Sequence, residues 1–209
     1  MDFELDLEEL FDSLNENVKK DVKDFNDIVN LDGCLKREIY IIGSVDGLGS
    51  TIDGYIRFWN NWDAKHEIPV EERKPIKIYI DSVGGSITDA LTIMDSIKLS
   101  KTPVWTIGIG KVWSSGFEIF YMGHKRLCYP HANFLWHEGS IGTNNVDAHK
   151  FRNYADFYDK QLEQFKEMLL SNTKITEEFF DKNRKDDVWM FADEAIELGV
   201  ADEIVKELV

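Results

Sequence analysis

Two segments rich in serine and glycine lie where a predicted strand meets a predicted helix. The first, residues 82–86, reads Ser-Val-Gly-Gly-Ser. Its paired glycines let backbone amides approach a ligand closely, and the N-terminus of the following helix adds positive potential. The segment lacks the phosphate-binding pattern GxxxxGK[ST] and the dinucleotide pattern GxGxxG. A structural tight turn is the alternative interpretation.

The second segment, residues 108–116, reads Gly-Ile-Gly-Lys-Val-Trp-Ser-Ser-Gly. A serine at such a turn can act as a nucleophile, because the backbone N–H groups that follow it can stabilise an oxyanion. A helix N-cap is the structural alternative. Spacing alone does not choose between Ser114 and Ser115 as the nucleophile.

His137 is the histidine best placed for acid–base chemistry. It ends the apolar strand predicted over residues 133–136 and precedes Glu138-Gly139. Catalytic groups are often mounted where a strand passes into a loop. A structural histidine remains the alternative for His137. The chain's other histidines are His66, His124, His131 and His149.

The charge of the chain excludes several function classes. The 209 residues carry 39 acidic and 24 basic side chains, a net charge of −15. Such a charge repels phosphate backbones and anionic membrane surfaces. No apolar run is long enough to span a membrane, and the acidic N-terminus is unlike a secretory signal. Cys34 and Cys128 form no CxxC pair, so we expect reduced cysteines, no metal site and a cytoplasmic protein.

The acidity is concentrated at the N-terminus. Residues 1–32 hold 11 acidic residues and three lysines. Apolar residues recur there at steps of three and four, which is typical of an amphipathic helix. Asp32-Gly33 is a stop signal for that helix. We therefore predict an acidic helical arm over residues 1–35 and a second unit over residues 36–209.

From residue 37 onward the pattern predicts an α/β fold. Strands alternate with helices, which favours parallel pairing with right-handed crossovers. The predicted strands cover residues 38–42, 76–80, 104–109, 133–136 and 201–205. The predicted helices cover residues 50–64, 87–99, 114–122, 145–171, about 176 onward and 192–198, and residues 65–75 are a predicted loop.

Taken together, four of these elements resemble the Clp protease proteolytic subunit family. Residues 78–86 are similar to its INSPGG element, residues 110–116 to its nucleophile segment, and residues 135–138 to its histidine segment. Residues 185–199 are similar to its RDxxxxAxEAxxxG segment. The resemblance covers roughly residues 36–206. It implies the Clp protease/crotonase fold, a spiral of β-β-α units with a protruding helix-strand handle.

The resemblance also implies roles for individual residues. It makes Ser114 the nucleophile, His137 the base and Asp187 the third triad member. It assigns the oxyanion hole to the backbone amides of Gly85 and Ser115. Substrate binding would fall to Gly84, Ile87, Glu138 and Gly139. No metal and no organic cofactor is implied, since ATP would be used by a partner unfoldase and not by this chain.

By resemblance, the chain is a serine endopeptidase of peptide and protein substrates that assembles into one heptameric ring or stacked heptamers. The long helix 145–171 would lie at the contact between rings. An ATP-driven AAA+ unfoldase would dock in apolar pockets near Tyr79, Leu99, Ile107, Ile109 and Val205. Three alternatives stay open: a virus-type peptidase that processes capsid or scaffold proteins, a non-catalytic ring subunit, and a crotonase-type enzyme acting on coenzyme A thioesters.

Overall fold

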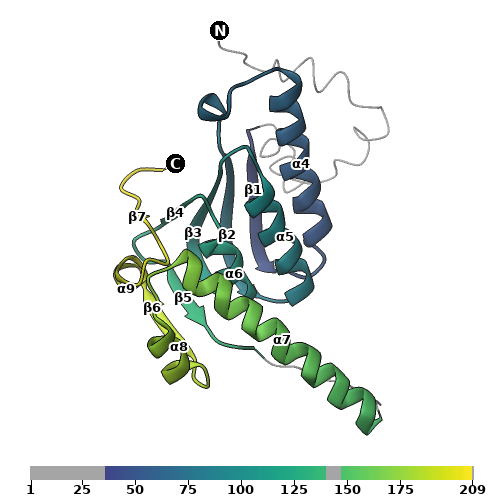
Figure 1. Cartoon of the computed structure of the whole chain (residues 1–209). Coiled ribbons are helices and arrows are strands. Elements are labelled where there is room, and N and C mark those ends of the chain that lie inside the picture. The colour runs from purple at the N-terminus through teal and green to yellow at the C-terminus, as the bar shows by residue number, and fades with distance from the viewer. Residues whose placement is uncertain (1–35, 140–146, 209) are drawn as a thin grey trace.

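The computed structural model describes residues 36–139 and 147–208 and shows strands and helices alternating along the chain (Figure 1). The predicted acidic arm, residues 1–35, lies outside the described residues. The strands are β1 (Glu38–Ser44), β2 (Ile76–Gly84), β3 (Val104–Trp113), β4 (Lys125–Cys128), β5 (Asn133–Trp136), β6 (Val188–Phe191) and β7 (Glu203–Ile204). The helices are α4 (Gly49–Lys65), the 3-10 helix η1 (Val70–Glu72), α5 (Ile87–Leu99), α6 (Ser115–Tyr121), α7 (Ala148–Asn172), α8 (Glu177–Asn183) and α9 (Ala192–Glu197).

The described strands form one sheet in the order β1-β2-β3-β4-β7, and neighbours along this path are parallel. Strand β3 is long enough to pair twice, with β4 along Trp105–Gly108 and with β5 along Lys111–Trp113. Strand β6 joins β5 in the antiparallel sense. This arrangement confirms the predicted α/β class with mostly parallel pairing, and it agrees with the Clp protease/crotonase fold.

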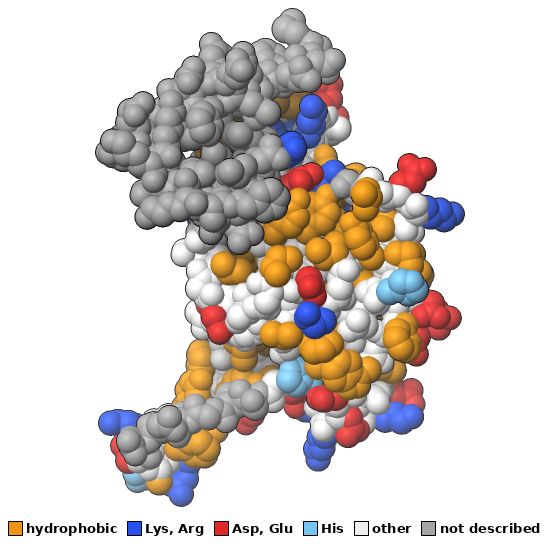
Figure 2. Space-filling model, turned by 180° about the vertical axis from the view of Figure 1, so that it is seen from behind, with side chains coloured by type: hydrophobic (Ala, Val, Ile, Leu, Met, Phe, Trp, Pro, Cys, Tyr) orange, Lys and Arg blue, Asp and Glu red, His pale blue; other side chains and the backbone are white. Residues whose placement is uncertain are grey.

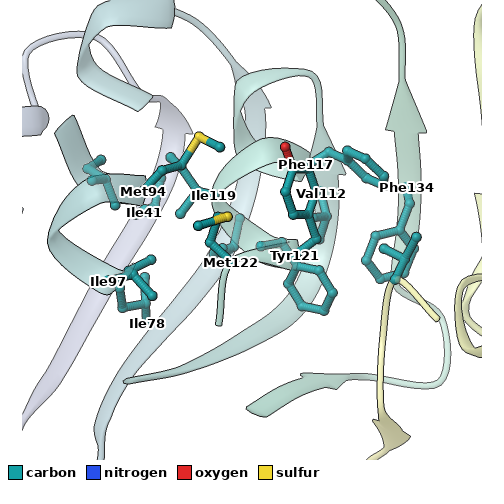
Figure 3. Close-up of a cluster of buried hydrophobic side chains, with 14 of the residues drawn as sticks. Ile41, Ile78, Met94, Ile97, Val112, Phe117, Ile119, Tyr121, Met122 and Phe134 are labelled. Atoms are coloured by element: carbon teal, nitrogen blue, oxygen red, sulfur yellow. The ribbon is translucent and has the colours of Figure 1, made fainter. Parts of the chain in front are cut away.

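The core lies between the sheet and the helices that cover it. Figure 3 shows Met94 and Ile97 of α5 beside Ile41 of β1 and Ile78 of β2. All four side chains are fully buried. Burial of apolar side chains of this size contributes about 1.5–3 kcal/mol each, so the sheet-to-helix layer is the main source of stability.

The structure differs from the predicted boundaries at the ends of the strands. Strand β2 continues through the predicted glycine turn to Gly84, because Ser82 still pairs with Val112 and Gly84 with Ser44. Strand β3 likewise runs on to Trp113. Strand β6 was not predicted, because what defines it is its antiparallel pairing with the distant strand β5, which no local pattern contains. The predicted loop 65–75 contains the short 3-10 helix η1.

Helix α7 projects from the body of the molecule, as expected of the predicted handle helix (Figure 1). Its C-terminal half packs on the core through Phe165, Met168 and Leu169. Its projecting half exposes aromatic side chains at Phe151, Tyr154 and Phe157. Figure 2, seen from behind, shows hydrophobic side chains along this projection. The helix therefore carries an apolar face that the described part of the chain does not cover.

Candidate active site

Ser114 occupies the sharp turn between β3 and α6. Its backbone angles, φ +52° and ψ −126°, lie in a region that residues with a side chain rarely adopt. Its N–H donates to the Leu135 carbonyl at 2.9 Å, which ties the turn to β5. Such strain persists only where the surroundings hold it, and it is common at functional sites. The turn places Ser114 at the N-terminus of α6, whose first N–H groups have no partner within the helix.

Gly84 makes this turn possible by its lack of a side chain. A Cβ atom added there would lie 2.7 Å from the Ser114 Cβ and 2.9 Å from the Trp113 carbonyl oxygen. The Gly84 backbone also has a φ of +95°, which favours glycine. Gly84 therefore supports the position of Ser114 from the neighbouring strand β2.

The parallel pairing of β3 with β5 brings His137 to Ser114. Trp113 lies opposite Leu135 in this register, so the residues that follow the two strands emerge at the same edge of the sheet. The His137 Nε2 atom lies 2.8 Å from the Ser114 Oγ atom. This is a hydrogen-bond distance, and an imidazole in this position can take the hydroxyl proton.

The antiparallel pair β5–β6 brings Asp187 to the other side of the imidazole. Trp136 pairs with Val188, so Asp187 lies across from His137, one step beyond the end of the ladder. Its Oδ1 lies 3.7 Å from His137 Nδ1, which is longer than a hydrogen bond. The Asp187 side chain is 58% exposed. The structure thus brings together all three residues predicted as a triad, with the second contact looser than the first.

The two predicted oxyanion-hole residues also meet, but through a side chain. The Gly85 N–H donates to Ser115 Oγ at 3.0 Å, and the Ser115 hydroxyl donates to the Gly85 carbonyl at 2.7 Å. The Gly85 amide therefore has an acceptor in this structure. A substrate oxyanion would have to take the place of the Ser115 hydroxyl at that N–H group.

Comparison with known proteins agrees with this geometry. The family model for Clp protease matches residues 69–208, which is more than half of the chain. The chain belongs to the Clp protease family. By family it is a serine-type endopeptidase.

Individual relatives in the Clp protease family are identical to the chain at about a third of the aligned positions. One is the ATP-dependent Clp protease proteolytic subunit 3 of Rhizobium johnstonii, 35% identical over 62% of this chain and 68% of that protein. Another is proteolytic subunit 2 of Treponema denticola, 33% identical over 64% of this chain and 67% of that protein. Proteolytic subunit 3 of Parasynechococcus marenigrum is 30% identical over 77% of this chain and 78% of its own length.

A pocket opens beside the Ser114 hydroxyl of this Clp protease family member. Of the four residues predicted to bind substrate, Ile87, Glu138 and Gly139 line it, whereas Gly84 supports the serine turn from beneath. The remaining wall is apolar and comes from β5, α7 and α8. These wall residues are Trp136, Leu162, Phe165 and Phe180, of which sequence reasoning did not identify the last three.

Glu138 and Gly139, which line the pocket, are held in place by further contacts. The Arg184 Nε atom lies 2.8 Å from a Glu138 carboxylate oxygen. The Tyr158 hydroxyl of α7 donates to the Glu138 carbonyl at 2.6 Å. Gly139 has a φ of +76° and passes close to the same hydroxyl. These contacts hold the segment after His137 against α7 and α8.

Sequence reasoning also missed an acidic residue of the pocket, Glu118. It lies on α6 among Phe117, Ile119 and Phe120, which are fully buried. Burial raises the pKa of Glu118 to about 8 and that of Tyr121 well above its usual value. A lone acidic residue in an apolar helix, four positions after the nucleophile, was the sequence signal that could have identified it.

The described residues contain no cluster of three or more His, Cys, Asp or Glu side chains that could hold a metal ion. Cys128 is buried and free, and burial raises the pKa of its thiol to about 11. Among the helices over residues 36–139 and 147–208, none combines the length and the apolar character needed to cross a membrane.

Proposed function

We propose that the chain hydrolyses peptide bonds through Ser114, His137 and Asp187. The observation that carries this proposal is the 2.8 Å contact between His137 Nε2 and Ser114 Oγ at a strained turn beside an apolar pocket. A serine hydroxyl is a weak nucleophile until an adjacent base accepts its proton. Membership of the Clp protease family supports the same chemistry.

In the first half of the reaction, Ser114 Oγ attacks the substrate carbonyl while His137 Nε2 takes the hydroxyl proton. The charged imidazole faces Asp187, which stabilises it and fixes its orientation. The resulting oxyanion would accept hydrogen bonds from the Gly85 and Ser115 N–H groups. His137 then donates its proton to the leaving amine as the C–N bond breaks, and water hydrolyses the acyl-enzyme by the same steps.

Covalent labelling of the full chain with a fluorophosphonate tests the nucleophile directly. We expect one adduct, mapped by peptide mass spectrometry to Ser114, because only a serine activated by a base reacts readily. Ser114→Ala should abolish labelling, and His137→Ala should reduce it strongly. Ser171→Ala is a matched control, since this exposed serine of α7 lies outside the site. Labelling that persists in Ser114→Ala would contradict the proposal.

We also propose that the chain works as a ring of identical subunits. The exposed aromatic residues Phe151, Tyr154 and Phe157 recur every three positions along the projecting half of α7, so they form one apolar stripe. An exposed apolar stripe of this kind marks a contact with another protein chain. Native mass spectrometry should give a seven-fold or fourteen-fold species, and Phe157→Ser should weaken the assembly. A monomer at micromolar concentration would contradict this part of the proposal.

The proposed partner is an ATP-driven unfoldase, because the relatives are named as proteolytic subunits of ATP-dependent Clp proteases. A second apolar cluster joins four of the five residues predicted for docking. Tyr79 and Ile107 are buried in it, and Ile109 and Val205 are partly buried. Leu99 lies outside this cluster and is 80% exposed at the end of α5. If an unfoldase docks on this surface, it should accelerate cleavage of folded proteins, because they must be unfolded before they reach Ser114. Cleavage of short peptides should not change.

A non-catalytic ring subunit is the alternative that the site geometry disfavours. A non-catalytic subunit would not require the strained backbone of Ser114. It would also not require a hydrogen-bond distance between His137 Nε2 and Ser114 Oγ. Absence of both labelling and peptide cleavage in a chain that forms rings would favour that alternative.

A further inference from the structure

Two of the residues that line the pocket beside Ser114 carry a carboxyl group. One is Glu138, which is paired with Arg184. The other is Glu118, whose relative exposure is only 9%. The pocket therefore has one acidic group that a protein cation neutralises and one buried acidic group that no cation of the described residues neutralises.

Helix geometry places Glu118 behind the nucleophile. The Glu118 N–H donates to the Ser114 carbonyl at 3.1 Å, so the two residues are one turn apart on the same face of α6. A substrate carbonyl attacked by Ser114 lies at the mouth of this pocket. The side chain on the N-terminal side of the scissile bond, called P1, therefore enters the space that Glu118 lines.

Within the described part of the chain, the Tyr121 hydroxyl one turn further on is the group that interacts with the Glu118 carboxyl, but no hydrogen bond of good geometry satisfies the Glu118 Oε2 atom or that hydroxyl. The nearby cations are already paired. Lys166 contacts Glu177 and Asp181, and Arg184 contacts Glu138. A buried polar group without a partner is costly, so a ligand that supplies the partner gains that free energy on binding.

We infer that Glu118 gives this site a preference for substrates with lysine or arginine at P1, an inference that rests on the proposed peptidase function. The apolar wall suits the methylene stem of such a side chain, and the carboxylate suits its charged end. Trypsin uses an acidic residue in its P1 pocket in the same way.

The preference should strengthen as pH rises. Burial raises the pKa of Glu118 to about 8, so the free site is largely neutral at pH 7. A bound cation favours the ionised carboxylate and releases the proton. The other titratable or charged groups near the pocket, from α6, the segment after β5, α7 and α8, are Tyr121, His137, Glu138, Lys166 and Arg184.

The test uses two fluorogenic peptides that differ only at P1, one with lysine and one with norleucine, its uncharged counterpart of similar length. The full chain is assayed at pH 7 and pH 9. We expect kcat/KM to favour lysine by about 10- to 100-fold, the range of a charge-assisted hydrogen bond. The ratio should be larger at pH 9 than at pH 7.

Glu118→Gln keeps the shape of the side chain and removes its charge, so the lysine-to-norleucine ratio should fall to about one. Glu178→Gln on the exposed face of α8 is the matched control and should keep the wild-type ratio. If the wild type cleaves the lysine peptide no better than the norleucine peptide, the inference is overturned. This comparison does not depend on whether a variant folds. A ratio unchanged in Glu118→Gln overturns it as well. Cleavage of neither peptide by the wild type would instead contradict the proposed function.

Discussion

His137 and Asp187 face each other across the end of the β5–β6 pair, with Nδ1 and Oδ1 3.7 Å apart. The separation is too long for a hydrogen bond, although the strand register places both residues correctly. Catalytic contacts are often long in the absence of substrate and shorten when substrate binds. In the proposed mechanism the imidazole becomes charged, so a shorter contact with Asp187 would stabilise it better.

Asp187→Asn tests this contact. An amide can hold the imidazole in the wrong tautomer and cannot stabilise its charged form, so kcat should fall by about 10²- to 10⁴-fold with little change in KM. Steady-state peptide hydrolysis measures both constants. Asp186→Asn, a change at the neighbouring exposed carboxylate, is the control and should leave kcat near the wild-type value. Full activity in Asp187→Asn would remove this residue from the mechanism.

Gly84→Ala tests the support of the serine turn. The added methyl would lie 2.7 Å from the Ser114 Cβ, so the turn must move. We expect at least a tenfold loss of kcat/KM and about 1–3 kcal/mol of lost stability from overpacking. Gly54→Ala on α4 is the control, because nothing lies within 4 Å of its added Cβ. Equal activity of the two variants would show that the turn tolerates displacement.

Ser115→Ala tests whether the Gly85 amide limits the reaction. The Ser115 hydroxyl accepts the Gly85 N–H at 3.0 Å and competes with a substrate oxyanion for it. Its removal should raise kcat by about 2- to 10-fold, the worth of one neutral hydrogen bond. Single-turnover kinetics of the acylation step give the cleanest measure. A large fall in the acylation rate would mean that the Ser115 side chain helps to hold the oxyanion hole.

Glu118→Gln should also change how stability depends on pH. The pKa of Glu118 is raised from 4.5 to about 8, so the folded chain keeps a proton that the unfolded chain loses. The stability linked to this proton is fully present below pH 4.5 and is lost as pH rises through 8. The total is on the order of 5 kcal/mol, at about 1.4 kcal/mol per pKa unit.

Urea unfolding at pH 5 and pH 9 measures this linkage. The stability of Glu118→Gln relative to the wild type should increase between the two pH values. Glu178→Gln, with its exposed side chain, should follow the wild type at both. If Glu118→Gln also follows the wild type, the Glu118 carboxyl is not titrating in a buried environment.

The sequence predicted those elements whose boundaries depend on local chemistry. Helix α5 has the predicted bounds 87–99, and Ser86 caps it by accepting the Asp89 N–H. Strand β5 also matches, because its apolar run ends sharply at His137. The extensions of β2 and β3 were missed because they depend on pairing with neighbouring strands, which no local pattern contains.

The triad residues could be predicted from their motifs, but their distances could not. The 3.7 Å gap at Asp187 and the bond between Gly85 and Ser115 depend on small shifts of packed strands. The pocket was missed for a different reason. Its wall comes partly from Phe165 and Phe180 on α7 and α8, which lie far from Ser114 in sequence and join it only through the fold.

Ser114 is the residue that we propose as the nucleophile of a peptidase. The most direct measurement compares the rate of peptide hydrolysis by the full-length wild type and by Ser114→Ala at equal concentration and assembly state. We predict that the wild type cleaves and that kcat falls by about 10⁴-fold or more in the variant, since removal of a triad member leaves only the oxyanion hole and binding. An unchanged rate in Ser114→Ala would contradict the account.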